Sequence, residues 1–391
     1  MPMFEKAVRN PHEFTFKDDF RGRAAQQVVK ELDGKSNLLM DAVYMKSNED
    51  TRHRGRRNEE IKDTAVTVAS DEGHPYSAGT HEVEYTTELG LVADGCKFDS
   101  IEEDNAPNAD VISTERQDIS DTMESVNRKD AWMTVYGDQR VDPKGWNGLA
   151  YYTRKVTTRS TFEQNFYAGI NPFEGEDLCL TIDNQADASS SATKLSASYG
   201  NIFGSIWAVV WDKNYVAKIY PKESDTYGID TTVSPVSTVW NANNDRWHTQ
   251  RMIAFRKGSG VNVHNRFGLI RIANVNFDKI VHTTAAPTTD VNHDVKEEYE
   301  RLCANMAFVE EIYQKLGITS KVKFYCPTPL IRKMRAARAM GNASQSNIYY
   351  SIPGVEQAGQ IHGIMADKFY INDNYLVTPE FQMVATEAFL A

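Results

Sequence analysis

The sequence predicts an α+β fold, in which helices and strands occupy different parts of the chain. Three observations support this class. A helical pattern runs from about 111 to 136, the stretch 150–290 is rich in strand patterns, and two more helical patterns follow at 294–317 and 328–341. No internal repeat is visible, so we expect one elongated protein of several parts rather than a repeat array.

Composition excludes several classes of protein. The 391 residues carry a formal net charge of −11, and 41% of them are hydrophobic. That hydrophobic content supports a sizeable core, so wholesale disorder is not expected. A dedicated nucleic-acid binder would normally carry a basic excess instead. No run of about 18 apolar residues occurs, and the first residues lack the apolar stretch of a secretion signal, so we expect neither a membrane protein nor a classically secreted one.

The N-terminal part predicts an arm followed by a projecting ribbon. Residues 1–36 are polar and end in a short helical pattern, and 37–45 form a short apolar segment. The stretch 46–90 is too polar for a core. Its alternating runs 64–69 and 80–85 flank a turn-rich segment, which indicates two strands that project into solvent.

The pattern over 111–136 predicts a long helix with a single apolar stripe. An acidic loop at 98–110 precedes it, and Gly137, Pro143 and Gly145 end it. The residues of the stripe recur about every 3.5 positions on an otherwise charged rod. They are Ile112, Ile119, Met123, Val126 and Met133.

The middle of the chain is predicted to be mainly β. Strand patterns occupy 178–182 and 265–277, and the stretch 205–222 indicates two strands around a turn at 212–214. A loop of small residues at 184–201 separates the first of these strands from the others.

The C-terminal part returns to helix. Asp294 and Gly317 are the expected caps of one helix, and Thr328, Pro329 and Gly341 mark the ends of the next. The second helix carries four basic residues, which we interpret as a solvated or acid-paired face opposite an apolar stripe. The final apolar stretch at 361–377 predicts a closing pair of strands. The four basic residues are Arg332, Lys333, Arg335 and Arg338.

No pattern of catalytic, cofactor or metal chemistry is present, so we expect no enzyme, no cofactor and no metal. The dinucleotide, Walker, zinc-protease, esterase and EF-hand motifs are absent from the sequence. No two of the four cysteines form a Cys-x-x-Cys pair, which argues against a zinc site or a disulfide scaffold. Cys179 lies in an apolar strand pattern and is interpreted as a buried small hydrophobe.

The run Thr-Arg-His-Arg-Gly-Arg-Arg at 51–57 is the strongest local charge feature. Within 46–63, six basic residues face five acidic ones, so the local excess is only +1. Flanking acids would repel phosphates, whereas alternating blocks of charge suit a complementary protein surface. We therefore predict a subunit interface formed by Arg52, Arg54, Arg56 and Arg57, with Glu102, Glu103 and Asp104 of the acidic loop as partners on a neighbouring copy.

The order of these parts resembles the major capsid proteins of tailed bacteriophages, which have the Hong Kong 97-type fold. Several stretches resemble a podovirus capsid family in particular. They are NLLMDAVYMKSNEDTRHRGRR at the entry to the ribbon, RFGLIRIANVNF in the later strand and, most specifically, SIWAVVWDKNYVAKIYPKESDTYGI at 205–229. The order and spacing match from about residue 37 to 390.

The resemblance implies a division of the chain into the parts of that fold. The long helix would be the spine helix, and the ribbon would be the extended loop. The implied parts are the N-terminal arm 1–45, the extended loop 46–92, the spine helix and peripheral domain 93–160, the first part of the axial domain 161–262, peripheral strands 263–293, axial and peripheral helices 294–350, and the closing strands of the peripheral domain 351–391.

The resemblance also implies a function and partners. The chain would assemble through hexamers and pentamers into an icosahedral virion head, formed in the host cytoplasm, that encloses double-stranded DNA without sequence-specific binding. A separate scaffolding protein, a portal and a decoration protein would be its partners. The alternative is the shell of an encapsulin-type nanocompartment, which can share the fold. The rod-like helix and the projecting ribbon favour assembly in either case, because neighbouring subunits would cover them.

Overall fold

The computed structural model describes most of the chain, and the account below is confined to those residues. They are 36–58, 67–71, 73, 82–99, 108–168, 179–186, 188, 194–224, 228–241, 246–278, 295–318, 322–341, 369–371, 375–384 and 386–391. The predicted arm helix before residue 36 therefore lies outside the described residues.

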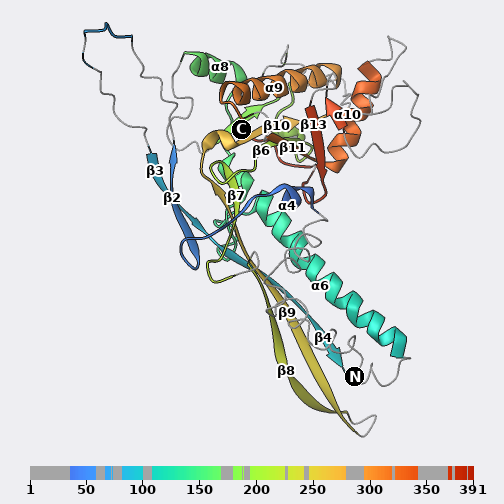
Figure 1. The fold of residues 1–391 in the computed structure, drawn as a ribbon. Helices are drawn as coiled ribbons and strands as arrows, with labels where there is room; N and C mark the ends of the chain where they lie inside the picture. The colour runs from blue at the N-terminus through green and yellow to red at the C-terminus, as the bar shows by residue number, and fades with distance from the viewer. Residues whose placement is uncertain are drawn as a thin grey trace, which may run out of the picture. The chain divides into compact units, whose positions relative to one another are not determined.

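Contacts divide the chain into two units, each made of separate stretches. Both contain helices and strands, which confirms the predicted α+β class (Figure 1). Unit 1 comprises Met1–Arg54, Thr86–Leu149 and Lys218–Asn262, and unit 2 comprises Gly55–Tyr85, Ala150–Ala217 and Val263–Ala391.

Unit 1 is built on a five-stranded sheet around the long strand β9 (Arg246–Val263). On one side, β8 (Ile229–Asn241) forms an antiparallel hairpin with β9. On the other side, β4 (Gly90–Asp99) runs antiparallel to β9 in continuous register from Gly90↔Ser259 to Asp99↔Gln250. The sheet continues through β7 (Val216–Tyr220) to β1 (Tyr44–Lys46), which is parallel to β7.

The long helix α6 (Asn108–Tyr136) packs on this sheet and confirms the helix predicted over 111–136. The expected stripe faces inward, because Ile119, Met123 and Val126 lie against Phe255 of β9 and against residues of β4. The helix ends at Gly137, whose amide bonds the Met133 carbonyl. A Cβ at this glycine would lie 2.2 Å from the Trp146 carbonyl oxygen, so only glycine fits there.

A buried charge cluster also fixes α6 to the sheet. Asp130 accepts a hydrogen bond from Lys218 of β7 at 2.7 Å and forms an ion pair with Lys257 of β9 at 2.9 Å. All three side chains are almost wholly inaccessible to water. Thr134 accepts a further hydrogen bond from Lys218 at 2.7 Å, and Asn127 accepts one from Lys257 at 3.3 Å. One carboxylate therefore connects the helix to two strands.

Unit 2 is built on a six-stranded sheet in the order β12-β13-β11-β6-β10-β5. Its central strand β6 is antiparallel to both neighbours, β10 and β11. The strand β5 is parallel to β10, and β13 is parallel to β11 but antiparallel to β12. The strands are β5 (Leu180–Asp183), β6 (Gly204–Val210), β10 (Leu269–Val275), β11 (Val322–Pro327), β12 (Phe369–Ile371) and β13 (Tyr375–Glu380). Strands β5, β6 and β10 confirm the strands predicted in this part of the middle region. The antiparallel pair β12–β13 confirms a closing pair, although β13 extends past the predicted end at residue 377. Strand β11 was not predicted.

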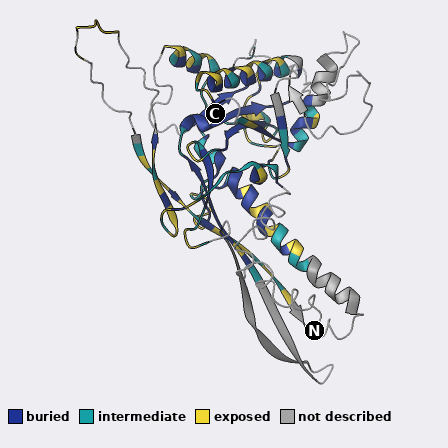
Figure 2. Cartoon of the chain, in the orientation of Figure 1, coloured by how far each residue is buried: buried dark blue, intermediate teal, exposed yellow. Residues whose placement is uncertain are grey.

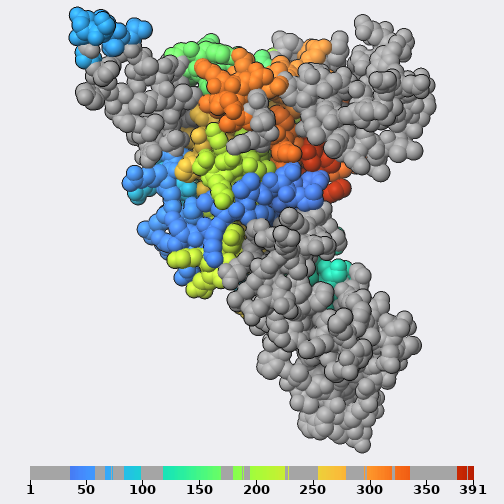
Figure 3. Space-filling view, viewed as in Figure 1, coloured from blue at the N-terminus to red at the C-terminus, as the bar shows by residue number. Residues whose placement is uncertain are grey.

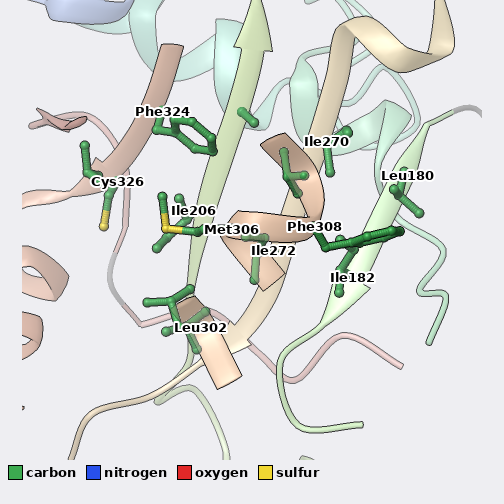
Figure 4. Packing of buried hydrophobic residues seen from close by; sticks show 14 of the residues in the cluster. Leu180, Ile182, Ile206, Ile270, Ile272, Leu302, Met306, Phe308, Phe324 and Cys326 are labelled. Atoms are coloured by element: carbon green, nitrogen blue, oxygen red, sulfur yellow. The ribbon is translucent and has the colours of Figure 1, made fainter. Parts of the chain in front are cut away.

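Helices cover this sheet and close the main core of unit 2. Leu302, Met306 and Phe308 of α9 (Val295–Lys315) belong to the same buried cluster as Ile206 and Ile272 of the sheet (Figure 4). The helix α10 (Thr328–Gly341) packs against α9 and β11, and α8 (Arg159–Tyr167) adds two phenylalanines to the cluster. Both C-terminal helices predicted from the sequence are confirmed.

The burial pattern of these elements matches their amphipathic sequences. The strands β6 and β10 are dark blue throughout in Figure 2, because each of their residues is buried. The outer side of α9 lies on the surface of unit 2, where its residues are orange in Figure 3. In α10, Leu330, Ile331 and Met334 face inward as predicted, while Lys333 pairs with Asp278.

Candidate assembly interface

The Arg-rich run lies in strand β2 (Arg52–Asn58), which forms a two-stranded sheet with β3 (Glu82–Glu88). The prediction that 64–69 forms the first strand of the ribbon was wrong, because β3 pairs with β2 instead. Residues 67–69 have no regular structure, and 64–66 lie outside the described residues. Along β2, exposed side chains alternate with less exposed ones, as expected for a strand with one face in solvent.

This alternation separates the predicted interface residues. Arg52, Arg54 and Arg56 are exposed, whereas Arg57 is buried with 6% of its surface accessible. Successive side chains of a strand point to opposite faces, so the three exposed guanidinium groups share one face of β2. The proposed partner residues Glu102, Glu103 and Asp104 lie outside the described residues.

The start of β2 is held by the loop before it. The Asn48 side chain accepts from the Arg54 amide at 2.9 Å and donates to the Arg54 carbonyl at 2.7 Å. This pair of bonds substitutes for a strand partner. The Arg54 guanidinium also lies 3.1 Å from the Glu49 carboxylate. The backbone of β2 is therefore fixed at this end, while the guanidinium remains at the surface.

The centre of the ribbon depends on a glycine. A Cβ at Gly55 would lie 2.4 Å from the Tyr85 hydroxyl, so the tyrosine ring of β3 occupies the space that a side chain would need. The hydroxyl is 3.4 Å from Nδ1 of His264, and the two rings meet edge to face. Within unit 2, this ring stack connects the ribbon to the segment that follows β9.

Two of the exposed arginines form ion pairs at the surface of their own chain. Arg56 lies 3.9 Å from Glu84, and both side chains are more than half exposed. Exposed ion pairs of this kind contribute roughly 0–1 kcal/mol and are screened by salt. Carboxylates of another molecule can replace such partners at little cost, so this face of β2 is suited to reversible electrostatic docking.

The buried cysteine near the ribbon is not a nucleophile. Burial raises the pKa of the Cys179 thiol to about 12, although Arg57 and Arg266 lower it. The thiol therefore stays protonated at neutral pH and behaves as the buried hydrophobe predicted from its sequence context. Within the described parts of the chain, no group of three or more His, Cys, Asp or Glu residues is arranged to hold a metal ion.

Sequence reasoning missed the buried Asp130, although a signal was available. Asp130 follows Val126 by four positions and precedes Met133 by three, so it lies on the apolar stripe of α6. A carboxylate on the inward face of an amphipathic helix indicates a buried cationic partner.

Among the residues that the structure describes, no helix is both long and apolar enough to cross a membrane.

Comparisons with known proteins identify one matching protein family. The family model described as "Major capsid protein GP7" matches residues 184–364. No curated protein matches the sequence. The match covers a little under half of the chain, and it agrees with the resemblance to the major capsid proteins of tailed bacteriophages.

Solved structures with a similar chain path include bacteriophage Epsilon15, with a TM-score of 0.48 and 14% identity over 90% of this chain and 88% of that one. The bacteriophage JBD30 capsid has a TM-score of 0.40 and 8% identity over 86% and 89%. The encapsulin SrpI of Synechococcus elongatus has a TM-score of 0.33 and 14% identity over 64% and 90%.

Proposed function

We propose that this chain is a major capsid protein that assembles through hexamers and pentamers into an icosahedral head, which encloses double-stranded DNA. The family match over residues 184–364 carries the proposal. A net charge of −11 supports containment without tight or sequence-specific DNA binding, because an acidic protein repels phosphates. No catalytic role is proposed for the chain.

The proposal includes the parts and partners that the resemblance implies. The ribbon β2–β3 corresponds to the extended loop assigned to 46–92, and α6 corresponds to the spine helix within 93–160. A separate scaffolding protein, a portal and a decoration protein are the proposed partners. Weak contacts repeated in many copies suit such an assembly, because each contact remains reversible enough to correct errors.

Sedimentation and negative-stain microscopy of the expressed protein test this function. We expect closed shells, formed either alone or with the candidate scaffolding protein. A stable lone monomer under every condition would refute the proposal. Shells that contain a cargo protein and its docking peptide in place of DNA would support the encapsulin-type alternative.

We propose further that Arg52, Arg54 and Arg56 dock on carboxylates of a neighbouring copy, with Glu102, Glu103 and Asp104 as the partners. The exposure of these three arginines on one face of β2 supports this role. Arg57, which the sequence analysis included in the same interface, is buried within its own unit, so it supports the ribbon rather than offering an exposed charge.

The interface is tested by reversing two exposed charges of β2. The variant Arg52→Glu/Arg56→Glu should keep the thermal stability of the subunit and lose most of its shell yield. The matched control Lys144→Glu/Lys213→Glu changes the charge equally at two exposed loop positions and should assemble normally. Normal shells from the arginine variant would contradict the proposed interface.

A further inference from the structure

Residues 386–391, here termed the strap, are bound along one side of the unit 2 sheet. Glu387 forms an isolated antiparallel bridge with Phe203, the residue before β6. Both backbone bonds of the bridge are present, with N···O distances of 3.2 and 2.7 Å. Phe389 packs edge to face on the ring of Phe203 at 5.2 Å between centroids. The strap is therefore bound as a short strand with its own side-chain contacts.

Side chains of the sheet recognise the strap at two points. At the first point, the Glu387 carboxylate accepts from Arg271 at 2.8 Å and from the Ser205 hydroxyl. Arg271 stacks on the Trp207 ring at 4.5 Å, and both members of the ion pair are less than a tenth exposed. A charged pair of this kind is oriented by its hydrogen bonds, so the position selects a carboxylate.

At the second point, Asn274 binds the backbone of Leu390 in both directions. Its amide group donates to the Leu390 carbonyl at 2.8 Å, and its side-chain oxygen accepts from the Leu390 amide at 2.8 Å. Asn274 has a φ of 59°, a conformation that costs energy in any residue but glycine. Phe203, Ser205, Arg271 and Asn274 together form what we term the strap groove.

We propose that the strap groove of one copy binds the strap of a neighbouring copy in the assembled shell. All the contacts above are the same whether the strap comes from the same chain or from another one. The balance between the two arrangements is therefore decided by the connecting segment and by the local concentration of straps, as in domain swapping. A shell holds many copies side by side, which makes that concentration high.

The connecting segment favours the exchanged arrangement. Phe381 is 69% exposed and Val384 is 42% exposed, although Met383 between them is buried. The segment 381–384, which leads to the strap, therefore keeps two apolar side chains in water when the strap stays on its own chain. A neighbouring copy that receives the strap brings protein surface to this segment, and burial of these side chains stabilises the exchange.

The occupant is a second copy because the groove already fits this sequence. A carboxylate is needed opposite Arg271, and the strap supplies it at Glu387. A partner protein of other sequence would need the same carboxylate, the same strand geometry and an aromatic ring for Phe203. The inference rests on the proposed assembly into shells, and the experiment below distinguishes a failure of the strap exchange from a failure of shell formation.

Two single-cysteine variants test the exchange. Ile202 and Ala388 lie one residue beyond the bridged pair on the two antiparallel segments, and neither is buried. Such neighbours have Cα atoms about 4.5 Å apart, which permits a disulfide. Shells are co-assembled from Ile202→Cys and Ala388→Cys chains in equal amounts, oxidised, and separated on a non-reducing gel. Because each chain carries only one of the two new cysteines, a disulfide between them joins two chains.

We expect a covalent heterodimer as a major product, absent when Lys213→Cys replaces Ile202→Cys. The unmodified chain, treated alike, controls for its own cysteines. The double variant Ile202→Cys/Ala388→Cys should then give covalent oligomers rather than closed monomers. If the double variant closes only within single chains and the mixture gives no heterodimer, the exchange is overturned while shell formation stands. Failure of the unmodified chain to form shells would instead refute the proposed function.

Discussion

Replacing Asp130 by asparagine should be among the most destabilising isosteric changes in unit 1. The substitution keeps the shape of the side chain but removes the only carboxylate that contacts both Lys218 and Lys257 in the described cluster. Removing one partner of a buried ion pair costs about 3–5 kcal/mol, because the other charge stays buried without compensation. Two ammonium groups lose their partner here, so we expect a loss at the upper end of that range. A domain with about 5–15 kcal/mol of stability loses a large part of it.

Urea denaturation followed by tryptophan fluorescence measures this loss, with a control on the same helix. Glu124 pairs with the exposed Arg128 one turn away, and Glu124→Gln should cost no more than about 0.5 kcal/mol. The double variant Asp130→Asn/Lys257→Met should recover part of the stability, because one of the two uncompensated charges is gone. Equal losses for Asp130→Asn and Glu124→Gln would refute the reasoning.

The pH dependence of the stability of Asp130→Asn gives an independent test of the same buried ion pair. Burial alone would raise the pKa of Asp130, but the ammonium groups of Lys218 and Lys257 outweigh it and hold that pKa well below the ordinary carboxyl range. A carboxyl group with a lowered pKa stabilises the fold above its unfolded pKa and loses this contribution as the pH falls below that value. The stability difference between the wild type and Asp130→Asn should therefore stay constant from neutral pH to about pH 4 and shrink only below it. A difference that shrinks between pH 7 and pH 5 would contradict this order of pKa values.

Two further predictions concern the ribbon and its surroundings. Gly55→Leu should displace the Tyr85 ring and make the ribbon more sensitive to limited proteolysis, whereas Gly73→Leu, with nothing within 4 Å of its Cβ, should leave cleavage unchanged. Because burial raises the pKa of Cys179 to about 12, this thiol should resist alkylation at pH 8 in the folded protein and react after denaturation, as peptide mass spectrometry would show; fast labelling in the folded state would refute its burial.

Long amphipathic patterns were predictable from the sequence, and the reason is local. In α6 and α9 the apolar residues recur at helical spacing over many turns, so burial of one face fixes both the element and its orientation. The strands β6 and β10 were predictable because their apolar runs are bounded by turn residues. Each of these segments contains its own signal within about twenty residues.

The elements that were missed depend on distant partners. The run Arg52–Asn58 is a strand because β3 and the ring of Tyr85 lie beside it, and its polar composition hides the alternation. The full length of β9 is likewise fixed by β4 and β8 rather than by its own residues. The direction of Arg57 could have been predicted from the parity of its position, once the run was recognised as a strand.

The pairing of β4 with β9 has a consequence for the synthesis of this protein. Gly90 pairs with Ser259, so the sheet of unit 1 cannot close until well over half of the chain has left the ribosome. The sheet of unit 2 waits longer, because β6 is made near the middle of synthesis while its neighbour β11 and the next strand β13 come near the end. Pairings between distant parts of a chain form slowly, and unpaired apolar strands aggregate while they wait. A chain whose run Ser205–Val210 stays unpaired during synthesis is therefore expected to need chaperones for its yield.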